Sequence, residues 1–426
     1  MQIARWILVL ASGSGILTTT AACEKDTTTD GAPAAAGAQN TSAGSGGETA
    51  QAGAASATGG RPQGQAGAAD GSGGTVSGTA GSAQASGGLK DAPGGASAET
   101  GGGSHATGGT GGDQDPWRPF SEASPWNTPI GNNPTLHAKS AEWIADWVTS
   151  SPYGEHLDVN LTGYSIPLYW ADSTTPTHTV TCDLGGEGFT SDDGFDATVE
   201  MPIPDGATPD PESDGHMLVV DRERNLEFGL YAAVNDNGTW TCALGATADL
   251  TGTGVRPLKE DADPWYLAHG ARACGFPLVA GLIRLEEIEV GRIEHALVVA
   301  YPHIRGGCYT SPASTAQAPT TDAHNDRGIP CGGRIQLDPE LDLESLGLDG
   351  PATTIARALQ RYGAYVGDYS GAMSLYGEAS PAALTRWEQL LDQDMIDRIP
   401  IDRFRVIAHT GDVYPDDNAG SGYVCE

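Results

Sequence analysis

Short apolar runs separated by polar turns recur through the C-terminal part of the chain. The segments YSIPLYW (164–170), HTVTCDL (178–184) and ATVEMPI (197–203) cluster or alternate apolar residues. Clusters of Gly, Pro and Asp bound each of them. Because period-two alternation with flanking turn residues is typical of strands, we expect each segment to form one.

The same pattern predicts two hairpins. Residues 215–234, GHMLVVDRERNLEFGLYAAV, hold two apolar runs around a polar turn at 222–225. A second turn, NDNG at 235–238, contains residues that accept positive φ, and TWTCALG (239–245) follows as the next strand. Further predicted strands are HALVVAYPH (295–303) and GGRIQLDP (332–339).

Helical spacing of apolar residues is confined to a few segments. The predicted helices are 139–148, 352–362 directly after Pro351, and one that begins at Ser380 with Pro381. Many short strands with few helices predict a mainly β fold, an antiparallel β-sandwich or jelly roll with peripheral helices. Regular alternation of strands and helices is absent, which argues against a doubly wound sheet.

The N-terminal part divides into two segments that do not belong to this fold. Arg5, an apolar stretch and then Thr20-Ala21-Ala22-Cys23 resemble a bacterial lipoprotein signal, in which Cys23 would be lipidated. An ordinary secretory signal cleaved near Ala22 is the alternative. Residues 23–115 are rich in Gly, Ala and Ser and predict a disordered tether with a coil dimension of about 50 Å.

This organisation predicts a signal peptide at 1–22, a tether at 23–115 and a globular β-rich domain at 116–426. No later run approaches the about 18 apolar residues of a membrane span, so we expect membrane attachment through the N-terminal lipid only. The formal net charge is −33. Such a charge repels phosphate backbones, which excludes nucleic acid as an expected partner and disfavours strongly anionic polymers.

Six cysteines remain once Cys23 is set aside for the lipid. They are Cys182, Cys242, Cys274, Cys308, Cys331 and Cys425. An even number predicts three disulfides and therefore an oxidising, extracytoplasmic compartment. We expect Cys308 to pair with Cys331, because that bridge would close the loop between two predicted strands. The absence of any CxxC pair argues against a zinc site.

Five residues are candidates for catalysis. His216 and His295 each occupy the first position of an apolar strand, at a sheet rim or facing a cleft, where an imidazole can act as general acid or base. The alternative for both is a structural histidine bonded to a backbone carbonyl. Glu287 lies between an apolar stretch and the His295 strand, Asp221 ends its strand, and Asp368 follows AYVG. For both aspartates the alternative is a turn residue that bonds its own backbone.

These residues suit two kinds of polysaccharide cleavage. A hydrolase would use Glu287 with Asp221 or Asp368 as acid and base. A lyase would use His295 to abstract the proton, with a tyrosine such as Tyr362 assisting. Exposed tryptophans would offer flat platforms for sugar rings.

Motifs for other chemistries are absent from the sequence. There is no GxSxG elbow, HExxH helix, phosphate-binding loop or dinucleotide fingerprint. We therefore expect no cofactor and no metal. A structural calcium ion is not indicated by a motif either, since the acidic stretch 412–420 does not fit an EF-hand loop.

Several ordered segments resemble a widespread group of uncharacterised secreted microbial proteins. These segments are GHMLVVD (215–221), GATADL (245–250) with Arg256-Pro257, GLIRLEEIEVGRIEHAL (281–297), a Ser-Pro-Ala segment at 311–313, GIPCGGRIQL (328–337) and ALQRYGAYVGDYSG (358–371). The last segment departs from the usual YGM…ADNG pattern of the group. The resemblance covers roughly residues 120–410. It implies an acidic residue at Glu287 but assigns no reaction.

Together these patterns favour an extracytoplasmic lipoprotein that acts on carbohydrate. We expect it to cleave a polysaccharide or other envelope glycan, and the acidic surface favours hydrolysis of a neutral glycan over elimination on a polyuronate. The alternative is a non-catalytic cell-envelope or glycan-binding lipoprotein. The two differ in one structural respect: an enzyme needs a carboxylate and a histidine that converge in a groove.

Overall fold

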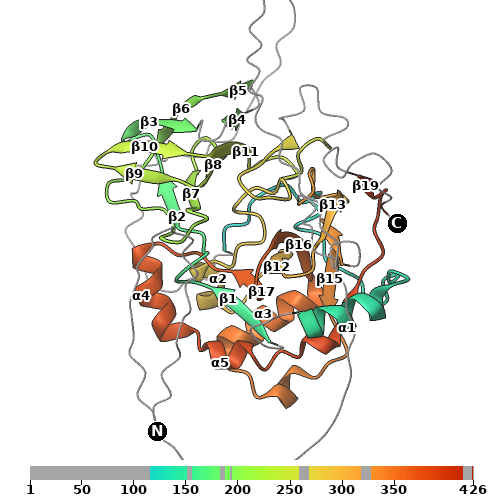
Figure 1. The fold of residues 1–426 in the computed structure, drawn as a ribbon. Helices are drawn as coiled ribbons and strands as arrows, with labels where there is room; N and C mark the ends of the chain where they lie inside the picture. The colour runs from blue at the N-terminus through green and yellow to red at the C-terminus, as the bar shows by residue number, and fades with distance from the viewer. Residues whose placement is uncertain are drawn as a thin grey trace, which may run out of the picture. The chain divides into compact units, whose positions relative to one another are not determined.

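The computed structural model describes residues 116–150, 156–182, 188–191, 194–258, 268–317, 328–415 and 425. The predicted signal peptide, Cys23 and the predicted tether lie outside these residues. The described part is mainly β with few helices, as the sequence predicted (Figure 1). Within it, no helix has the length and apolar character needed to cross a membrane.

One six-stranded sheet, here called the β12 sheet, has the strand order β1-β17-β12-β16-β15-β18. Its strands are β1 (Leu157–Asn160), β12 (Leu297–Tyr301), β15 (Arg334–Leu337), β16 (Ala364–Tyr369), β17 (Met373–Tyr376) and β18 (Phe404–Val406). The pairs β1–β17 and β12–β16 are parallel, and the others are antiparallel.

A second six-stranded sheet, the β7 sheet, has the order β2-β7-β8-β11-β4-β5. Its strands are β2 (Leu168–Ala171), β4 (Phe189–Ser191), β5 (Gly194–Asp196), β7 (Met217–Asp221), β8 (Leu226–Tyr231) and β11 (Leu244–Asp249). The predicted hairpin at 215–234 is confirmed, because β7 and β8 pair as antiparallel neighbours.

Two smaller sheets complete the β structure of the described ranges. The first has the order β6-β3-β10-β9 and the second β14-β13-β19. Their strands are β3 (Thr177–Cys182), β6 (Thr198–Pro202), β9 (Val234–Asp236), β10 (Thr239–Cys242), β13 (Arg305–Tyr309), β14 (Pro330–Cys331) and β19 (Tyr414–Pro415). The predicted turn at 235–238 joins β9 to its antiparallel neighbour β10, as expected.

The sheets are mixed rather than purely antiparallel. Parallel pairs include β2 with β7 and β3 with β10, whose members are separated by intervening elements along the chain. Local alternation of apolar residues predicts that a strand exists but carries no information on the direction of a distant partner. The antiparallel part of the sequence-based expectation was therefore only partly correct.

Helices surround the β12 sheet in the lower half of Figure 1. They are α1 (Ser140–Ser150), α2 (Leu285–Val290), α3 (Gly350–Arg361), α4 (Pro381–Leu390) and α5 (Gln393–Ile396), with 3-10 turns at Leu343–Leu346 and Ile401–Arg403. The Asp349 side chain accepts a hydrogen bond from the first turn of α3, and Ser380 does the same for α4. The three predicted helices are thus confirmed, and two of them have a capping side chain at their start.

Strand β7 contributes to two hydrophobic cores. Leu218 and Val220 belong to the larger core, which also contains β12, β16 and β17 residues. Met217 and Val219 belong to a smaller core that includes Val180 and Trp240 of the β3 and β10 strands. Because successive residues of a strand face opposite sides, this alternation places β7 between the two cores.

Three disulfides are present, as the cysteine count predicted. They join Cys182 to Cys242, Cys274 to Cys331, and Cys308 to Cys425. The predicted pair Cys308–Cys331 was wrong. In the β13–β14 register Tyr309 lies opposite Cys331, so Cys308 faces the other side of the sheet. Three disulfides indicate an oxidising, extracytoplasmic environment.

Candidate functional site

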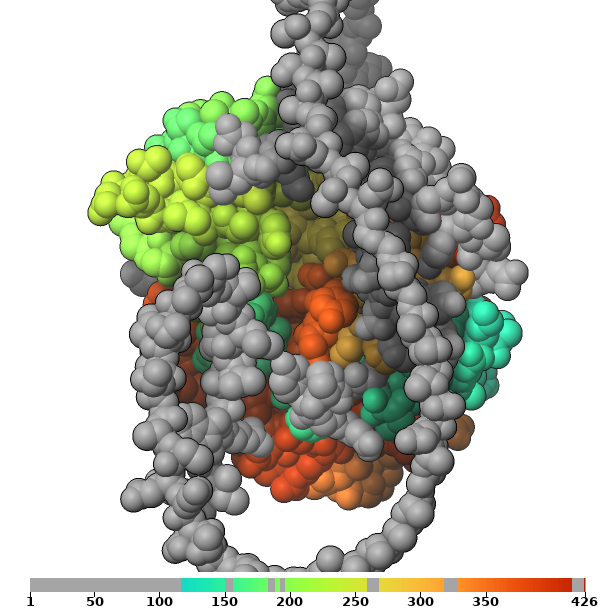
Figure 2. Space-filling model, in the orientation of Figure 1, coloured from blue at the N-terminus to red at the C-terminus, as the bar shows by residue number. Residues whose placement is uncertain are grey.

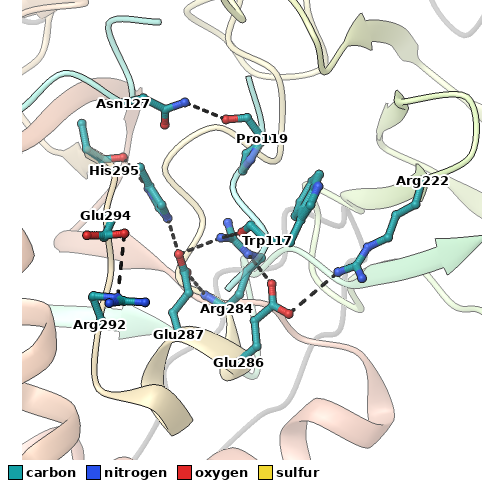
Figure 3. Close-up of polar contacts among 11 residues, drawn as sticks. Trp117, Pro119, Asn127, Arg222, Arg284, Glu286, Glu287, Arg292, Glu294 and His295 are labelled. Carbon is teal, nitrogen blue, oxygen red and sulfur yellow. Dashed lines mark hydrogen bonds and ion pairs between the residues drawn. The ribbon is translucent and has the colours of Figure 1, made fainter. Parts of the chain in front are cut away.

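Glu287 and His295 lie together in a buried network with Arg284, here called the Glu287 network (Figure 3). Arg284 precedes α2, and its backbone N–H donates to Glu287 Oε2 at 3.0 Å. The other carboxylate oxygen, Oε1, accepts a 2.7 Å hydrogen bond from Arg284 Nη2 and lies 2.9 Å from His295 Nε2. The second ring nitrogen of His295 lies 2.9 Å from the carbonyl of Ala296. Both carboxylate oxygens and both ring nitrogens therefore have partners.

Electrostatics fix the charge of this network. Burial opposes ionisation of Glu287, but the charges of Arg284 and His295 and their hydrogen bonds outweigh it and lower the pKa of this carboxyl. Each of the three residues is at most 3% exposed. Arg284 also donates to the carbonyl of Trp117 at 2.6 Å, which ties the start of the domain to α2. The network therefore holds parts of the fold together, since no polar atom of Glu287 or His295 faces an open space.

Asp221 lies at the β7–β8 turn. Its Oδ1 accepts from the Arg224 backbone N–H at 2.9 Å, and its Oδ2 accepts from Arg224 Nε at 2.6 Å. This geometry matches the alternative stated for Asp221, a turn residue that bonds neighbouring backbone. It does not bring Asp221 into contact with Glu287 or Asp368.

A second group of polar residues lies where the β7 and β12 sheets meet. It consists of Asp214, His216, Arg272, Asp368 and Tyr376, and we call it the Arg272 cluster. His216 directly precedes β7, Asp368 belongs to β16, and Tyr376 ends β17. Figure 2 shows orange atoms, from the part of the chain that holds β16 and β17, beside the green and yellow atoms of the part that holds β7 to β11. Two of the five predicted residues, His216 and Asp368, are thus brought together.

Arg272 is the centre of this cluster. Its side chain is 1% exposed, its guanidinium lies near the Tyr376 hydroxyl, and within the described ranges none of its nitrogens reaches full hydrogen-bond geometry. The guanidinium carbon lies 4.3 Å from the centre of the Tyr376 ring, a cation–π contact. A buried guanidinium with such poorly satisfied donors is costly, and such groups mark sites where a further partner belongs.

Two partly exposed carboxyls accompany Arg272. Burial raises the pKa of Asp368 to about 6; Arg272 opposes this rise, and the nearby Asp214 carboxyl adds to it. Burial also raises the pKa of Asp214, with Asp210 contributing in the same direction. With a pKa of about 6, the Asp368 carboxyl keeps its proton in mildly acidic solution, where it can serve as a general acid.

His216 and Tyr376 form the buried side of the cluster. Burial, followed by the charge of Arg272, lowers the pKa of His216 to about 3, so this imidazole is neutral. Its Nδ1 atom has no hydrogen-bond partner in the part of the chain that the structure describes. Tyr376 hydrogen-bonds to Asp368, and burial raises the pKa of this tyrosine. Both rings therefore offer neutral polar atoms beside the charged Arg272.

The loop that carries Asp214 is held by backbone contacts. The carbonyl of Asp214 accepts from the Ala232 N–H at 2.7 Å, and the carbonyl of His216 accepts from the Asp210 N–H at 2.8 Å. Gly215 has φ of +48°, and a Cβ at this position would lie 3.0 Å from the Ala233 nitrogen. Only glycine fits this turn without strain, so Gly215 fixes the position of the Asp214 side chain.

Sequence reasoning missed Asp214, Arg272, Tyr376 and the neighbouring Glu227. Glu227 is buried on β8 and accepts from the backbone N–H groups of Leu278 and Val279. Burial raises the pKa of Glu227 to about 7 despite these bonds. The sequence contained a signal that could have identified two of them. Glu227 lies in the mostly apolar segment LEFGLY and Arg272 in ARACG, a segment of small residues, and ionisable residues are rare in such segments.

Comparisons with protein-family models, with curated proteins and with solved structures find no match to this chain.

Proposed function

We propose that the protein is an extracytoplasmic, lipid-anchored protein that hydrolyses a neutral glycan at the Arg272 cluster. The observation that carries this proposal is the buried, poorly satisfied guanidinium of Arg272, which interacts electrostatically with the carboxyls of Asp214 and Asp368. The proposal of a lipid anchor is based on the sequence pattern from Thr20 to Cys23. The three disulfides support the extracytoplasmic location.

The donor and acceptor pattern of the cluster suits sugar hydroxyls. A hydroxyl can accept a hydrogen bond from a guanidinium and donate one to a carboxylate at the same time. A ligand with adjacent hydroxyls would therefore satisfy Arg272 and one of the aspartates together. An apolar ligand would leave the Arg272 donors unpaired, which disfavours it.

The charge of the cluster favours a neutral sugar over an acidic one. Two carboxyls, with that of Glu227 nearby, accompany one guanidinium, and the chain carries a net charge of −33. A uronate carboxylate would have to approach this acidic group, whereas a hydroxyl would not. This supports hydrolysis of a neutral glycan rather than elimination on a polyuronate.

Two aspartates can divide the chemistry of hydrolysis. Protonated Asp368 would donate its proton to the glycosidic oxygen as the bond to the anomeric carbon breaks. Ionised Asp214 would accept a proton from water as the water oxygen bonds to that carbon, or would itself bond to it and be released by water. Tyr376 orients Asp368 through its hydrogen bond.

One exposed tyrosine adjoins the cluster. The Tyr231 ring centre lies 5.6 Å from that of His216, and Tyr231 is 38% exposed. Exposed aromatic faces are the usual platforms for sugar rings. His216 and Asp368 both lie in the sequence segments that resemble the secreted microbial group. This supports placing the proposed site in the part of the chain that carries the resemblance.

The test is glycan cleavage by the full-length protein and three variants. Asp368→Asn and Asp214→Asn remove the proposed acid and base, and Asp221→Asn is the matched control because it removes a carboxylate at the β7–β8 turn. Each is incubated with neutral and acidic polysaccharides while new reducing ends and unsaturated sugars are followed. We expect cleavage of a neutral glycan, reduced about 10²-fold or more in the first two variants and retained in the control.

Three results would contradict the proposal. Unsaturated products from an acidic polymer would identify a lyase. Saturable glycan binding without cleavage would favour the non-catalytic glycan-binding lipoprotein. Equal loss of activity in Asp221→Asn would place the chemistry away from the Arg272 cluster.

A further inference from the structure

A second cluster of ligating side chains shares no residue with the Arg272 cluster. The geometry points to a site for a divalent transition-metal ion, with Zn²⁺ as the best fit, formed by His156, Asp158 and Asp397. One ligand atom from each of these residues lies within 4.8 Å of the others. The inference does not depend on the proposed glycan hydrolysis.

Strand β1 and the residue directly before it present two of the three ligands on one side. Leu157 and Val159 are buried in the larger core, so their side chains point inward. Because side chains alternate along a strand, His156 and Asp158 share the opposite face, two positions apart. This spacing brings an imidazole and a carboxylate to the same side of β1.

Helix α5 brings the third ligand to that face. The Gln393 side chain is bonded to both polar groups of the Val159 backbone: its Nε2 donates to the carbonyl at 2.7 Å, and its Oε1 accepts from the N–H at 3.3 Å. Asp397 directly follows α5 and caps its end. The double contact of Gln393 therefore fixes Asp397 relative to His156 and Asp158.

An unsatisfied oxygen indicates that a cation belongs here. Asp397 Oδ1 is shielded from solvent and has no hydrogen-bond partner among the described residues. A shielded carboxylate oxygen without a donor is unfavourable unless a cation compensates it.

The ligand types select the class of ion. Zn²⁺ binds imidazole nitrogen and carboxylate oxygen together, and three protein ligands with water in the remaining position are a common zinc geometry. Ca²⁺ and Mg²⁺ take oxygen ligands almost exclusively, so an imidazole disfavours them.

Zinc binding to the full-length protein tests the inference. The protein is freed of metal with a chelator and titrated with ZnCl₂, and separately with CaCl₂, by calorimetry. Thermal unfolding is followed with and without each ion. The variants are His156→Ala and Asp397→Asn. The matched controls are His178→Ala and Asp402→Asn, which remove a histidine and an aspartate outside the cluster.

We expect one Zn²⁺ per chain, a rise in unfolding temperature with Zn²⁺ and no comparable effect of Ca²⁺. Loss of a ligand should weaken Zn²⁺ binding by at least the about 10- to 100-fold that loss of an outer hydrogen-bond partner costs. Both controls should bind as the unmodified chain does. If Asp397→Asn does not fold by circular dichroism, His156→Ala decides the result, since its side chain lies on the outer face of β1.

Absence of saturable Zn²⁺ binding would overturn the inference, and so would equal binding by both ligand variants. Ca²⁺ binding as tight as that of Zn²⁺ would overturn the assigned class of ion. Because none of these measurements uses glycan cleavage, they stand whatever the outcome at the Arg272 cluster.

Discussion

Glu287 Oε1 lies 2.9 Å from His295 Nε2, and neither side chain is more than 3% exposed. Sequence patterns placed both residues among the candidates for catalysis. The structure gives each of them a complete set of partners, which favours a role in stability. Several expected outcomes follow from this network and from the Arg272 cluster.

Glu287→Gln should strongly destabilise the domain. The substitution leaves the buried Arg284 with only the partly exposed Glu286 as a counter-charge. Removal of one partner of a buried pair costs about 3–5 kcal/mol. Glu289→Gln is the control: Glu289 pairs with Arg386 at the surface, which is worth at most about 1 kcal/mol. Denaturant unfolding measures both. A stable Glu287→Gln protein that has lost glycan cleavage would instead make Glu287 catalytic.

The contribution of Glu287 to stability should also depend on pH. Its pKa in the folded protein lies below the ordinary value of 4.5, so the unfolded chain takes up the proton first as the pH falls. The stabilising effect is therefore fully present above about pH 4.5 and is lost as the pH falls through the folded pKa. Unfolding free energies of the unmodified and Glu287→Gln proteins should converge in acid. A constant difference across this range would contradict the assignment.

Glycan hydrolysis should decline on the alkaline side of about pH 6. Asp368 must be protonated to act as the acid, and its pKa is about 6. Arg272 lowers this pKa, so Arg272→Met should move the alkaline limb of the kcat profile to higher pH in whatever activity remains. Rate profiles against pH for both proteins measure the shift. An alkaline limb at the same pH in both proteins would show that Asp368 is not the general acid.

Gly215→Ala should cost more than Gly206→Ala. Both glycines have positive φ, and placing an L-residue there costs about 1–2 kcal/mol. A Cβ on Gly206 meets nothing within 4 Å, whereas one on Gly215 meets the backbone of Ala233 and Ala232. We expect the extra contact to displace Asp214 and reduce hydrolysis in Gly215→Ala alone. Thermal unfolding and cleavage rates of the two folded variants provide the comparison.

Local features of the fold were predictable from sequence, and long-range ones were not. The β7–β8 turn follows from the polar residues at 222–225, and the start of α3 follows from Asp349 and Pro351, because each depends on neighbours in the chain. The partners of Cys274 and Cys308 depend on sheet register, which no local pattern records.

The candidate site illustrates the same division. His216 and Asp368 were identified because each adjoins an apolar strand. Arg272 was overlooked because its meaning depends on segments that are remote in the sequence: the loop before β7, β16 and the end of β17. Arg272 lies in a segment of small residues. It becomes a neighbour of Asp214 and Asp368 only because the two six-stranded sheets meet there.

The pairing of β1 with β17 bears on how this chain must be assembled. Leu157 lies opposite Met373, so the edge strand of the β12 sheet finds its partner only after more than half of the chain has followed it. A polypeptide that emerges N-terminus first would expose β1 as an unpaired edge throughout that interval. Contacts of such wide separation slow folding and favour association between incomplete chains. We therefore expect productive folding to begin late and to benefit from chaperones that hold the emerging chain.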